Sequence, residues 1–311
     1  MIDLVREYVT YKRKLGFSIT IEAGMLMNFA RFADSIAHAG PLTTELMLRW
    51  AQLPDKATQL YRARRLEVVR CFAKYRQLFD PKTEIPHRLL LGKAHRRRTP
   101  NIYNEADIVA LMRGSRSLSA ENRLRSYTMA TIFGLLSCTG LRISEALNLE
   151  RSDFDRNQGI LTIRMTKFRK TRLVPLHQTA VKALIKYEKI RDRLVTTPKS
   201  NAFFLSSFGK RISPAMARYA FHSVETTINH RIQHGQYLPR LHDFRHAFAC
   251  RRIKSWYENG LDIDKMILSL STYLGHAKVT DTYWYITGTP ELLQIAASLF
   301  QPLPNDKGGE Q

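Results

Sequence analysis

A strongly basic segment divides this chain into two parts. It reads Gly-Lys-Ala-His-Arg-Arg-Arg-Thr-Pro from Gly92 to Pro100, and it follows two prolines, Pro81 and Pro86. Such a run is a poor helix interior, and its charges would be costly to bury, so we expect an interdomain linker. The 311 residues are enough for two domains that each bury a core. The expected boundaries are a first domain at 1–91, a basic linker at 92–101, a second domain at 102–301 and a disordered tail at 302–311.

The first 91 residues have the apolar periodicity of a helical domain. Apolar side chains recur at helical spacing from Leu4 to Leu15 and stop at Gly16, a favourable residue for a helix end. Further helices are predicted from about Thr20, after the capping threonines at 43 and 44, and over 57–79. In the last of these helices the side chains expected to face inward are Leu66, Val69, Phe72 and Phe79.

The second part combines helices with a small sheet. Asn104 can cap a helix whose third following residue is Asp107. Alternation over 160–165 and the strand-forming residues 172–174 predict a hairpin with 167–170 at its turn, and 203–205 is a candidate third strand. Further helices are predicted over 124–138, 179–195, 214–230, the segment after His242, and 290–300. The expected fold class is therefore mainly α with a small antiparallel β-sheet.

The balance of charge indicates a polyanionic partner. The chain has 49 Lys and Arg against 27 Asp and Glu, which gives a net charge of +22, far more than small neutral partners require. No apolar run is long enough to span a bilayer, and the amino terminus opens an amphipathic segment rather than a signal peptide. We therefore expect no membrane partner and a cytoplasmic, nucleoid-associated protein.

Basic residues on the predicted helix 57–79, in the linker and at the hairpin turn are candidate DNA contacts. Almost no acidic residues alternate with those on the helix to form the i,i+4 pairs of an ordinary surface helix. An extended basic linker laid along phosphates would release counterions at each contact. The simpler alternatives are a solvated helix face and a solvated linker. The candidates are Arg62, Arg65, Arg70, Lys74, Arg96, Arg97, Arg98, Arg169 and Lys170.

Three cysteines, Cys71, Cys138 and Cys250, lie far apart in apolar helical contexts. They form neither a disulfide framework nor a CxxC metal site, so we expect buried free thiols. An i,i+4 pair of histidines, His242 and His246, could bind zinc, but the sequence lacks the glutamate of HExxH and a clear third ligand. We expect no metal, and a structural or DNA-side role for His246.

A cluster of cations followed by a tyrosine suits phosphoryl transfer from DNA to protein. Cleavage of a phosphodiester places more charge on its non-bridging oxygens, and two always-charged guanidiniums, Arg142 and Arg245, can hold them. The departing 5′-oxygen needs a proton, and Lys167 on the hairpin turn is the candidate general acid, with Lys170 as its nearest competitor. A tyrosine hydroxyl can attack phosphorus and store the bond energy as a phosphotyrosine, without ATP, metal or other cofactor.

The motifs around these residues closely resemble those of the tyrosine recombinases, also called the phage integrase family. Arg142 lies in Thr-Gly-Leu-Arg-Ile-Ser-Glu, Lys167 precedes Arg-Leu-Val-Pro-Leu, and His242 and Arg245 lie in Leu-His-Asp-Phe-Arg-His. Leu-Gly-His ends at His276, nine positions before Tyr285. The resemblance covers residues 102–300 strongly, and the first 95 weakly through helical pattern and basic charge. It implies a helical, SAM-like core-binding domain followed by a catalytic domain.

The resemblance also implies roles for individual residues. Its spacing selects Tyr285 rather than Tyr283 as the nucleophile, and it aligns Lys167 with the family's catalytic lysine. His242 would accept the phenolic proton or hold a phosphate oxygen, while His276 would hydrogen-bond the phosphate. Glu145 would orient an arginine or histidine of the site. The catalytic set that it implies is Arg142, Lys167, His242, Arg245, His276 and Tyr285.

The expected function is therefore site-specific recombination of double-stranded DNA through a 3′-phosphotyrosine and a Holliday junction. The resemblance implies a DNA-bound homotetramer, with a dimer on each site, and leaves room for partner recombinases. Transposon-borne recombinases are the nearest likeness, which suggests integration, transposition or resolution of a mobile element. Two alternatives remain open: a type IB topoisomerase, which shares the chemistry, and a catalytically silent DNA-binding regulator on the same fold.

Overall fold

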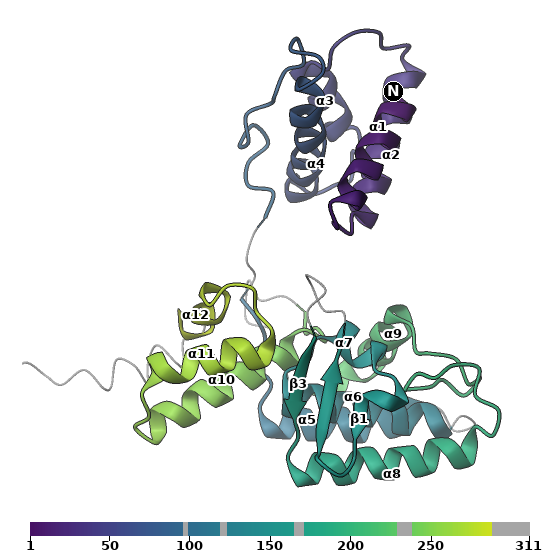
Figure 1. Ribbon diagram of the computed structural model, residues 1–311, viewed down its shortest axis with the longest axis vertical. Coiled ribbons are helices and arrows are strands. Elements are labelled where there is room, and N and C mark those ends of the chain that lie inside the picture. The colour runs from purple at the N-terminus through teal and green to yellow at the C-terminus, as the bar shows by residue number, and fades with distance from the viewer. Residues whose placement is uncertain (96–98, 119–122, 165–170, 229–237, 288–311) are drawn as a thin grey trace, which may run out of the picture. The chain divides into compact units, whose positions relative to one another are not determined.

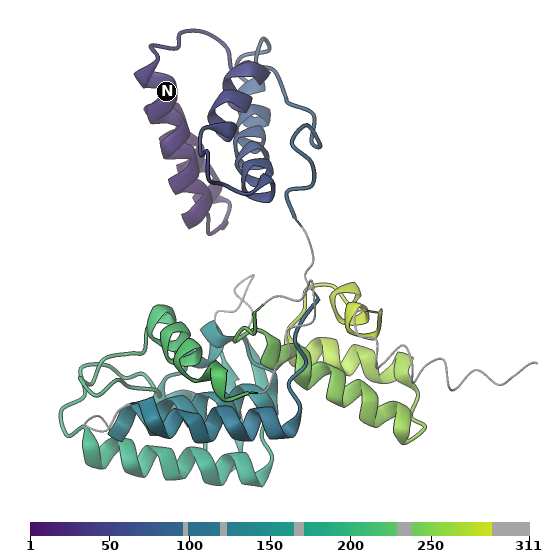
Figure 2. The ribbon, with the colours of Figure 1, turned by 180° about the vertical axis from the view of Figure 1, so that it is seen from behind.

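The computed structural model describes residues 1–95, 99–118, 123–164, 171–228 and 238–287. It divides into two compact units, Met1–Arg98 and Thr99–Gln311 (Figures 1 and 2). The division falls inside the predicted linker at 92–101. The predicted helix at 290–300 and the tail at 302–311 lie outside the described residues. No helix of the described ranges is long and apolar enough to cross a membrane.

The first unit consists of helices α1 to α4 (Figure 1). The phenylalanine and tryptophan rings of Phe29, Trp50 and Phe72 are fully buried between them. Phe79 does not face inward as its spacing predicted: it lies beyond the end of α4 and is 60% exposed, with its ring against Tyr75. The helices are α1 (Ile2–Lys14), α2 (Thr20–Ser35), α3 (Thr44–Gln52) and α4 (Gln59–Gln77).

The second unit packs helices on and around a three-stranded antiparallel sheet of order β1-β2-β3. In the β2–β3 hairpin, Thr162 lies opposite Leu173. Helix α6 runs through the middle of the unit and contacts α5, α8 and α10 (Figures 1 and 2). The elements are α5 (Glu105–Gly114), η1 (Ser115–Leu118), α6 (Arg123–Thr139), α7 (Ile143–Asn148), η2 (Arg151–Asp153), β1 (Phe154–Asp155), β2 (Ile160–Ile163), β3 (Arg172–Pro175), α8 (Gln178–Leu194), α9 (Pro214–Val224), η4 (Glu225–Thr227), α10 (Asp243–Glu258), α11 (Ile263–Leu274) and α12 (Thr280–Thr287).

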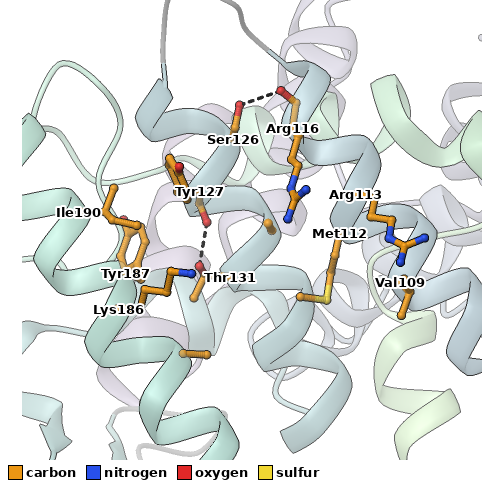
Figure 3. Close-up of a pocket in the computed structure, with 12 residues that line it drawn as sticks. Val109, Met112, Arg113, Arg116, Ser126, Tyr127, Thr131, Lys186, Tyr187 and Ile190 are labelled. Carbon is orange, nitrogen blue, oxygen red and sulfur yellow. Dashed lines mark hydrogen bonds between the residues drawn. The ribbon is translucent and has the colours of Figure 1, made fainter.

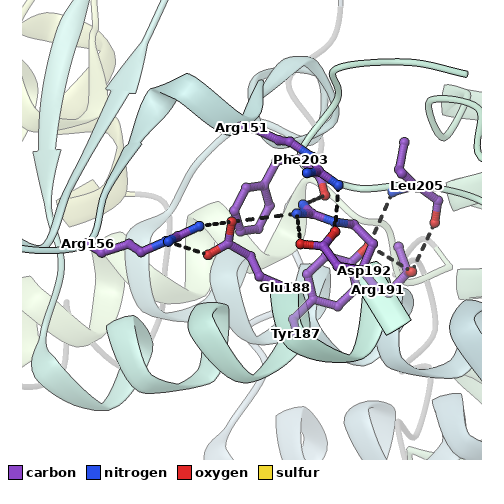
Figure 4. Close-up of polar contacts among 9 residues, drawn as sticks. Arg151, Arg156, Tyr187, Glu188, Arg191, Asp192, Phe203 and Leu205 are labelled. Carbon is purple, nitrogen blue, oxygen red and sulfur yellow. Dashed lines mark hydrogen bonds and ion pairs between the residues drawn. The ribbon is translucent and has the colours of Figure 1, made fainter. Parts of the chain in front are cut away.

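This architecture confirms the expected fold class, but the third strand is not the one that the sequence suggested. Residues 203–205 are not a strand, and β1 takes the third place in the sheet. The segment is instead held by the fully buried Arg191 of α8, whose Nη1 donates to the Phe203 carbonyl at 2.7 Å (Figure 4). The Leu205 backbone N–H donates to the Tyr187 hydroxyl at 3.2 Å. Side chains of α8 therefore satisfy backbone groups that a neighbouring strand would otherwise pair.

The cysteines are free, but only one of the three is buried as expected. Cys250 is buried on α10, whereas Cys71 and Cys138 are exposed. Cys71 lies beside Phe72 on α4, just outside the stripe of side chains that this helix buries. An apolar sequence context therefore did not fix the side of the helix on which each thiol lies.

Candidate active site

Arg142 is positioned by a turn that only glycine fits. Helix α6 ends at Thr139, and Gly140 adopts a φ of +63° before α7 begins at Ile143. A Cβ at Gly140 would lie 2.5 Å from the ring of Phe248 on α10. The tight turn places Arg142 at the amino-terminal end of α7, where backbone N–H groups also favour an anion.

Arg245 is buried in α10 and joins the ends of two other helices. Its side chain is almost fully buried, with Nη1 donating to the Gly140 carbonyl at 2.9 Å and Nη2 to the Leu274 carbonyl at 2.7 Å. Burial, followed by the charge of Arg142, lowers the pKa of Arg245 to about 10. It therefore stays charged at neutral pH, and its remaining N–H groups are available to other acceptors.

Tyr285 of α12 lies beside Arg245, with 3% of its surface exposed. Burial raises the pKa of the Tyr285 hydroxyl, while the charge of Arg245 and its hydrogen bond to the hydroxyl act in the opposite direction. Tyr283 lies elsewhere: it is 40% exposed, and its hydroxyl donates to Asp264 at 3.3 Å. The described structure thus brings Tyr285, and not Tyr283, to the two arginines.

His276 follows the end of α11 and lies against the Tyr285 ring. Gly275 ends the helix with a φ of +69°, and the His276 and Tyr285 rings stack with centroids 6.0 Å apart. His276 Nδ1 shares a hydrogen bond of 2.6 Å with the Thr282 hydroxyl, which fixes the ring orientation. Burial, then the charges of Arg245 and Arg142, lower the pKa of His276 to about 4. His276 is therefore neutral at pH 7.

His242, the N-cap residue of α10, and His246 within that helix complete the cluster. Burial, then the charge of Arg245, lower the pKa of His242 to about 4. The His246 ring meets His242 at 4.9 Å between centroids and Tyr285 at 5.4 Å, and burial lowers its pKa to about 3. The contact of His246 with Tyr285 was not predicted from the sequence, although the i,i+4 spacing of His246 from His242 was consistent with a shared helix face. Among the described residues, no three His, Cys, Asp or Glu side chains gather as a metal site.

These low histidine pKa values predict that acid destabilises the second unit. The unfolded chain takes up protons near the ordinary pKa of 6.5, whereas folded His242, His246 and His276 do so only at about 4, 3 and 4. Folding stability should therefore be complete above about pH 6.5 and fall as the pH drops towards 4. The thermal unfolding midpoint, measured from pH 7.5 to 4.5, should fall less steeply in His246→Phe than in the wild type. An identical slope in the two proteins would contradict this account.

Glu145 links two arginines, Arg142 and Arg172. Its Oε1 accepts from Arg142 Nη1 at 2.8 Å, and its Oε2 accepts from the Arg142 backbone N–H at 3.0 Å. Arg172, at the start of β3, donates to Oε1 and Oε2 at 3.1 and 2.8 Å. Burial raises the pKa of Glu145, but the hydrogen bonds and charges of Arg172 and Arg142 outweigh it and hold the pKa at about 2. In the sequence, Arg172 is only part of the Arg-Leu-Val-Pro-Leu motif that follows Lys167, and no local signal indicates its ion pair with Glu145.

The structure removes Arg65 from the candidate DNA contacts. Its side chain is buried in the first unit, where the guanidinium lies 3.9 Å above the Trp50 ring and Nη2 donates to the Trp50 carbonyl at 2.7 Å. The aromatic face and the carbonyl replace water around this cation. Arg65 therefore lacks acidic partners along the helix because its side chain points into the core, and not because it lies on a DNA-binding face.

The other candidates on α4 differ in how far they reach into solvent. Arg62 donates to the Pro54 carbonyl at 3.0 Å, and Arg70 to the Pro86 carbonyl at 2.7 Å. Both are half-buried, whereas Lys74 is exposed. Six candidates lie outside the described residues: Arg96, Arg97, Arg98, Lys167, Arg169 and Lys170.

A cavity of about 690 Å³ in the second unit lies apart from this cluster (Figure 3). Its walls come from α5, η1, α6 and α8, and they include Met112, Arg116, Tyr127 and Lys186. None of the residues that line it belongs to the catalytic set. The arginines, histidines and tyrosine described above instead gather where α7, α10, α11 and α12 meet. That arrangement can stabilise an anion and offers a phenol beside it.

Comparisons with known proteins agree with this arrangement. Residues 102–291 match the phage integrase family. An integrase/recombinase of Sinorhizobium fredii, y4rB, is 39% identical over 298 residues, which is 94% of each chain. The tyrosine recombinase XerD of Bradyrhizobium diazoefficiens is 28% identical over 294 residues, covering 89% of this chain and 88% of its own.

A solved structure shares the fold at low sequence identity. The integrase of the Tn1549 transposon, determined in complex with transposon right end DNA, has a TM-score of 0.64 and 14% identity, covering 95% of this chain and 98% of that one. Three findings lead to one assignment. They are the likeness in fold, the family match across most of the second unit, and the relative that matches nearly the whole chain. This protein belongs to the phage integrase family and is a tyrosine recombinase.

Proposed function

We propose that this recombinase cuts and rejoins DNA at specific sites through a 3′-phosphotyrosine formed on Tyr285. The observation that carries the proposal is the convergence of the Tyr285 phenol with two arginines and neutral histidines. Arg142 and Arg245 would bind the non-bridging oxygens of the scissile phosphate and stabilise the charge that develops on them. The resemblance to a transposon integrase held on DNA supports the choice of substrate.

The chemistry balances without a metal or a nucleotide. The Tyr285 oxygen attacks phosphorus, the bond to the 5′-oxygen breaks, and Lys167 supplies the proton that the leaving oxygen takes up. The phenolic proton passes to His242, or to solvent if His242 instead holds a phosphate oxygen, and His276 hydrogen-bonds the phosphate. A 5′-hydroxyl from the partner duplex then attacks the phosphotyrosine, displaces Tyr285 and restores the phosphodiester. Glu145 orients Arg142 throughout.

We further propose a DNA-bound homotetramer, with a dimer on each site. Exchange of two duplexes breaks and rejoins four strands, and each protomer offers one Tyr285. Partner recombinases could replace some protomers. Arg62, Arg70 and Lys74 of α4 and the basic residues outside the described ranges, which are Arg96, Arg97, Arg98, Arg169 and Lys170, would contact the DNA backbone. Integration, transposition or resolution of a mobile element, acting on nucleoid DNA in the cytoplasm, is the proposed role.

Recombination between two synthetic target sites tests this function against simple DNA relaxation. Incubation of paired sites in excess EDTA should yield four-way junctions and recombinant products, and the yield should fall steeply as salt screens the phosphate contacts. Native gels of end-labelled duplexes resolve these species. Relaxation of supercoiled DNA with no junction at any site pair would instead indicate a topoisomerase. Activity that EDTA abolishes and Mg²⁺ or Zn²⁺ restores would overturn the metal-free chemistry.

A further inference from the structure

Arg172 is a half-buried arginine at the start of β3 that contacts two other elements of the site, α7 and α11. Its guanidinium forms a two-point ion pair with Glu145, whose other hydrogen bonds come from Arg142. Its Nε donates to the Tyr273 carbonyl in the last turn of α11 at 2.9 Å. A planar guanidinium can donate to both Glu145 oxygens and to the Tyr273 carbonyl at the same time, which a lysine ammonium cannot.

The turn that precedes His276 is built to receive this side chain. Gly275 has a φ of +69°, and a Cβ there would lie 2.8 Å from Arg172 Nη1. Any larger residue would strain the backbone and push the guanidinium away. Arg172 also adds to the charges that lower the pKa of His276, after burial, Arg245 and Arg142. Its position therefore bears on the orientation of His276 and on that of Arg142.

Arg172 also affects how much of the Arg142 guanidinium remains available to bind the phosphate. Within the described residues, the Arg142 side chain reaches Glu145 only through Nη1, while Arg172 takes a donor position on each carboxylate oxygen. Without Arg172, Glu145 would be a buried carboxylate with Arg142 as its nearest countercharge. A two-point pair between them would then draw Arg142 away from the phosphate, because bidentate pairing is the stronger arrangement.

We propose that Arg172 is a positioning residue for strand cleavage: it neutralises and holds Glu145 so that Arg142 is free for the phosphate, and it orients the turn that carries His276. The proposal rests on the phosphotyrosine chemistry proposed above. Arg172 does not touch the reacting atoms in this account; it acts through Glu145 and the α11 carbonyl.

The test measures the rate of covalent adduct formation on a nicked DNA substrate under single-turnover conditions. Arg172→Met should slow this step by about 100-fold, as a misplaced catalytic group does, with little change in DNA affinity. Arg172→Lys, which keeps the charge, should recover part of the loss. Arg251→Met is the matched control, because this half-buried arginine of α10 donates to the Ser137 carbonyl and does not contact Glu145. All variants are assayed well below their thermal unfolding midpoints.

A pH profile separates positioning from a general loss of structure. The charges that face Glu145 are Arg172 from β3, Arg142 from the start of α7, and His242 and Arg245 from α10. In the wild type the pKa of Glu145 is about 2, so its ionisation has no effect near neutral pH. In Arg172→Met, burial should raise that pKa, so protonation of Glu145 should release Arg142, and the cleavage rate relative to the wild type should rise as the pH falls from 8 to 6. Glu145→Gln in the same chain, which removes the titrating carboxylate, should restore part of the rate and abolish this pH dependence.

Each outcome decides the proposal. A slow Arg172→Met whose relative rate rises as the pH falls, and which loses that pH dependence when Glu145→Gln is added, supports positioning through Glu145. A rate equal to that of Arg251→Met, or losses from Arg172→Met and Glu145→Gln that simply add in the double variant, would overturn it. If Arg172→Met does not fold, Arg172→Gln, which also lacks the charge, must show the same relative rise in rate at low pH, and its absence overturns the proposal. A wild type that forms no adduct would overturn the proposed function itself.

Discussion

Tyr285→Phe is expected to bind DNA normally and to form no covalent adduct with it. The phenylalanine ring preserves the packing against His246 and His276, while the oxygen that would attack phosphorus is lost. Removal of a covalent nucleophile typically costs on the order of 10⁴-fold or more. Loss of the hydrogen bond to the buried, charged Arg245 should cost about 2 kcal/mol of stability, as is typical for a bond to a charged group.

A suicide substrate with a nick near the cleavage site measures this result, since the short released strand leaves the adduct trapped. Tyr283→Phe is the matched control: its hydroxyl contacts Asp264 at the surface, and adduct formation should persist. A normal adduct yield from Tyr285→Phe would show that another residue is the nucleophile, and Tyr283 would be the first residue to test.

Lys167→Ala is expected to slow cleavage by about 100-fold or more, because the 5′-oxygen is a poor leaving group without a proton. A substrate with sulfur in place of that bridging oxygen should restore the rate, since a thiolate leaves without protonation. The same substrate should not rescue Arg142→Ala, whose loss affects the non-bridging oxygens. Rescue of Lys170→Ala instead, or rescue of neither lysine variant, would show that the general acid is not Lys167.

The helices were predictable because residues close in sequence determine where they begin. Thr43 accepts a hydrogen bond from the Leu46 backbone N–H and starts α3, as its position suggested. Asn104 and Asp107 exchange side-chain and backbone hydrogen bonds at the start of α5. The β2–β3 hairpin likewise follows from local alternation.

What the sequence did not reveal depends on contacts between residues far apart in the chain. A pattern of charges cannot show that Arg65 lies over Trp50 in the core of the first unit. The ion pair between Arg172 and Glu145 joins positions 27 residues apart, and neither local sequence indicates it. The segment 203–205 has strand-forming residues, yet it forms only an isolated bridge from Leu205 to Arg211, and Arg191 and Tyr187 bond the Phe203 carbonyl and the Leu205 N–H.

Mass spectrometry of the trapped protein–DNA adduct tests the central claim most directly. After nuclease and protease digestion, the peptide that spans Tyr283 to Tyr285 should carry one nucleotide, and fragmentation should place it on the Tyr285 oxygen through a 3′-phosphate. The released strand should end in a free 5′-hydroxyl. A nucleotide on any other residue, a 5′-phosphate linkage, or cleavage with no covalent adduct would contradict the account.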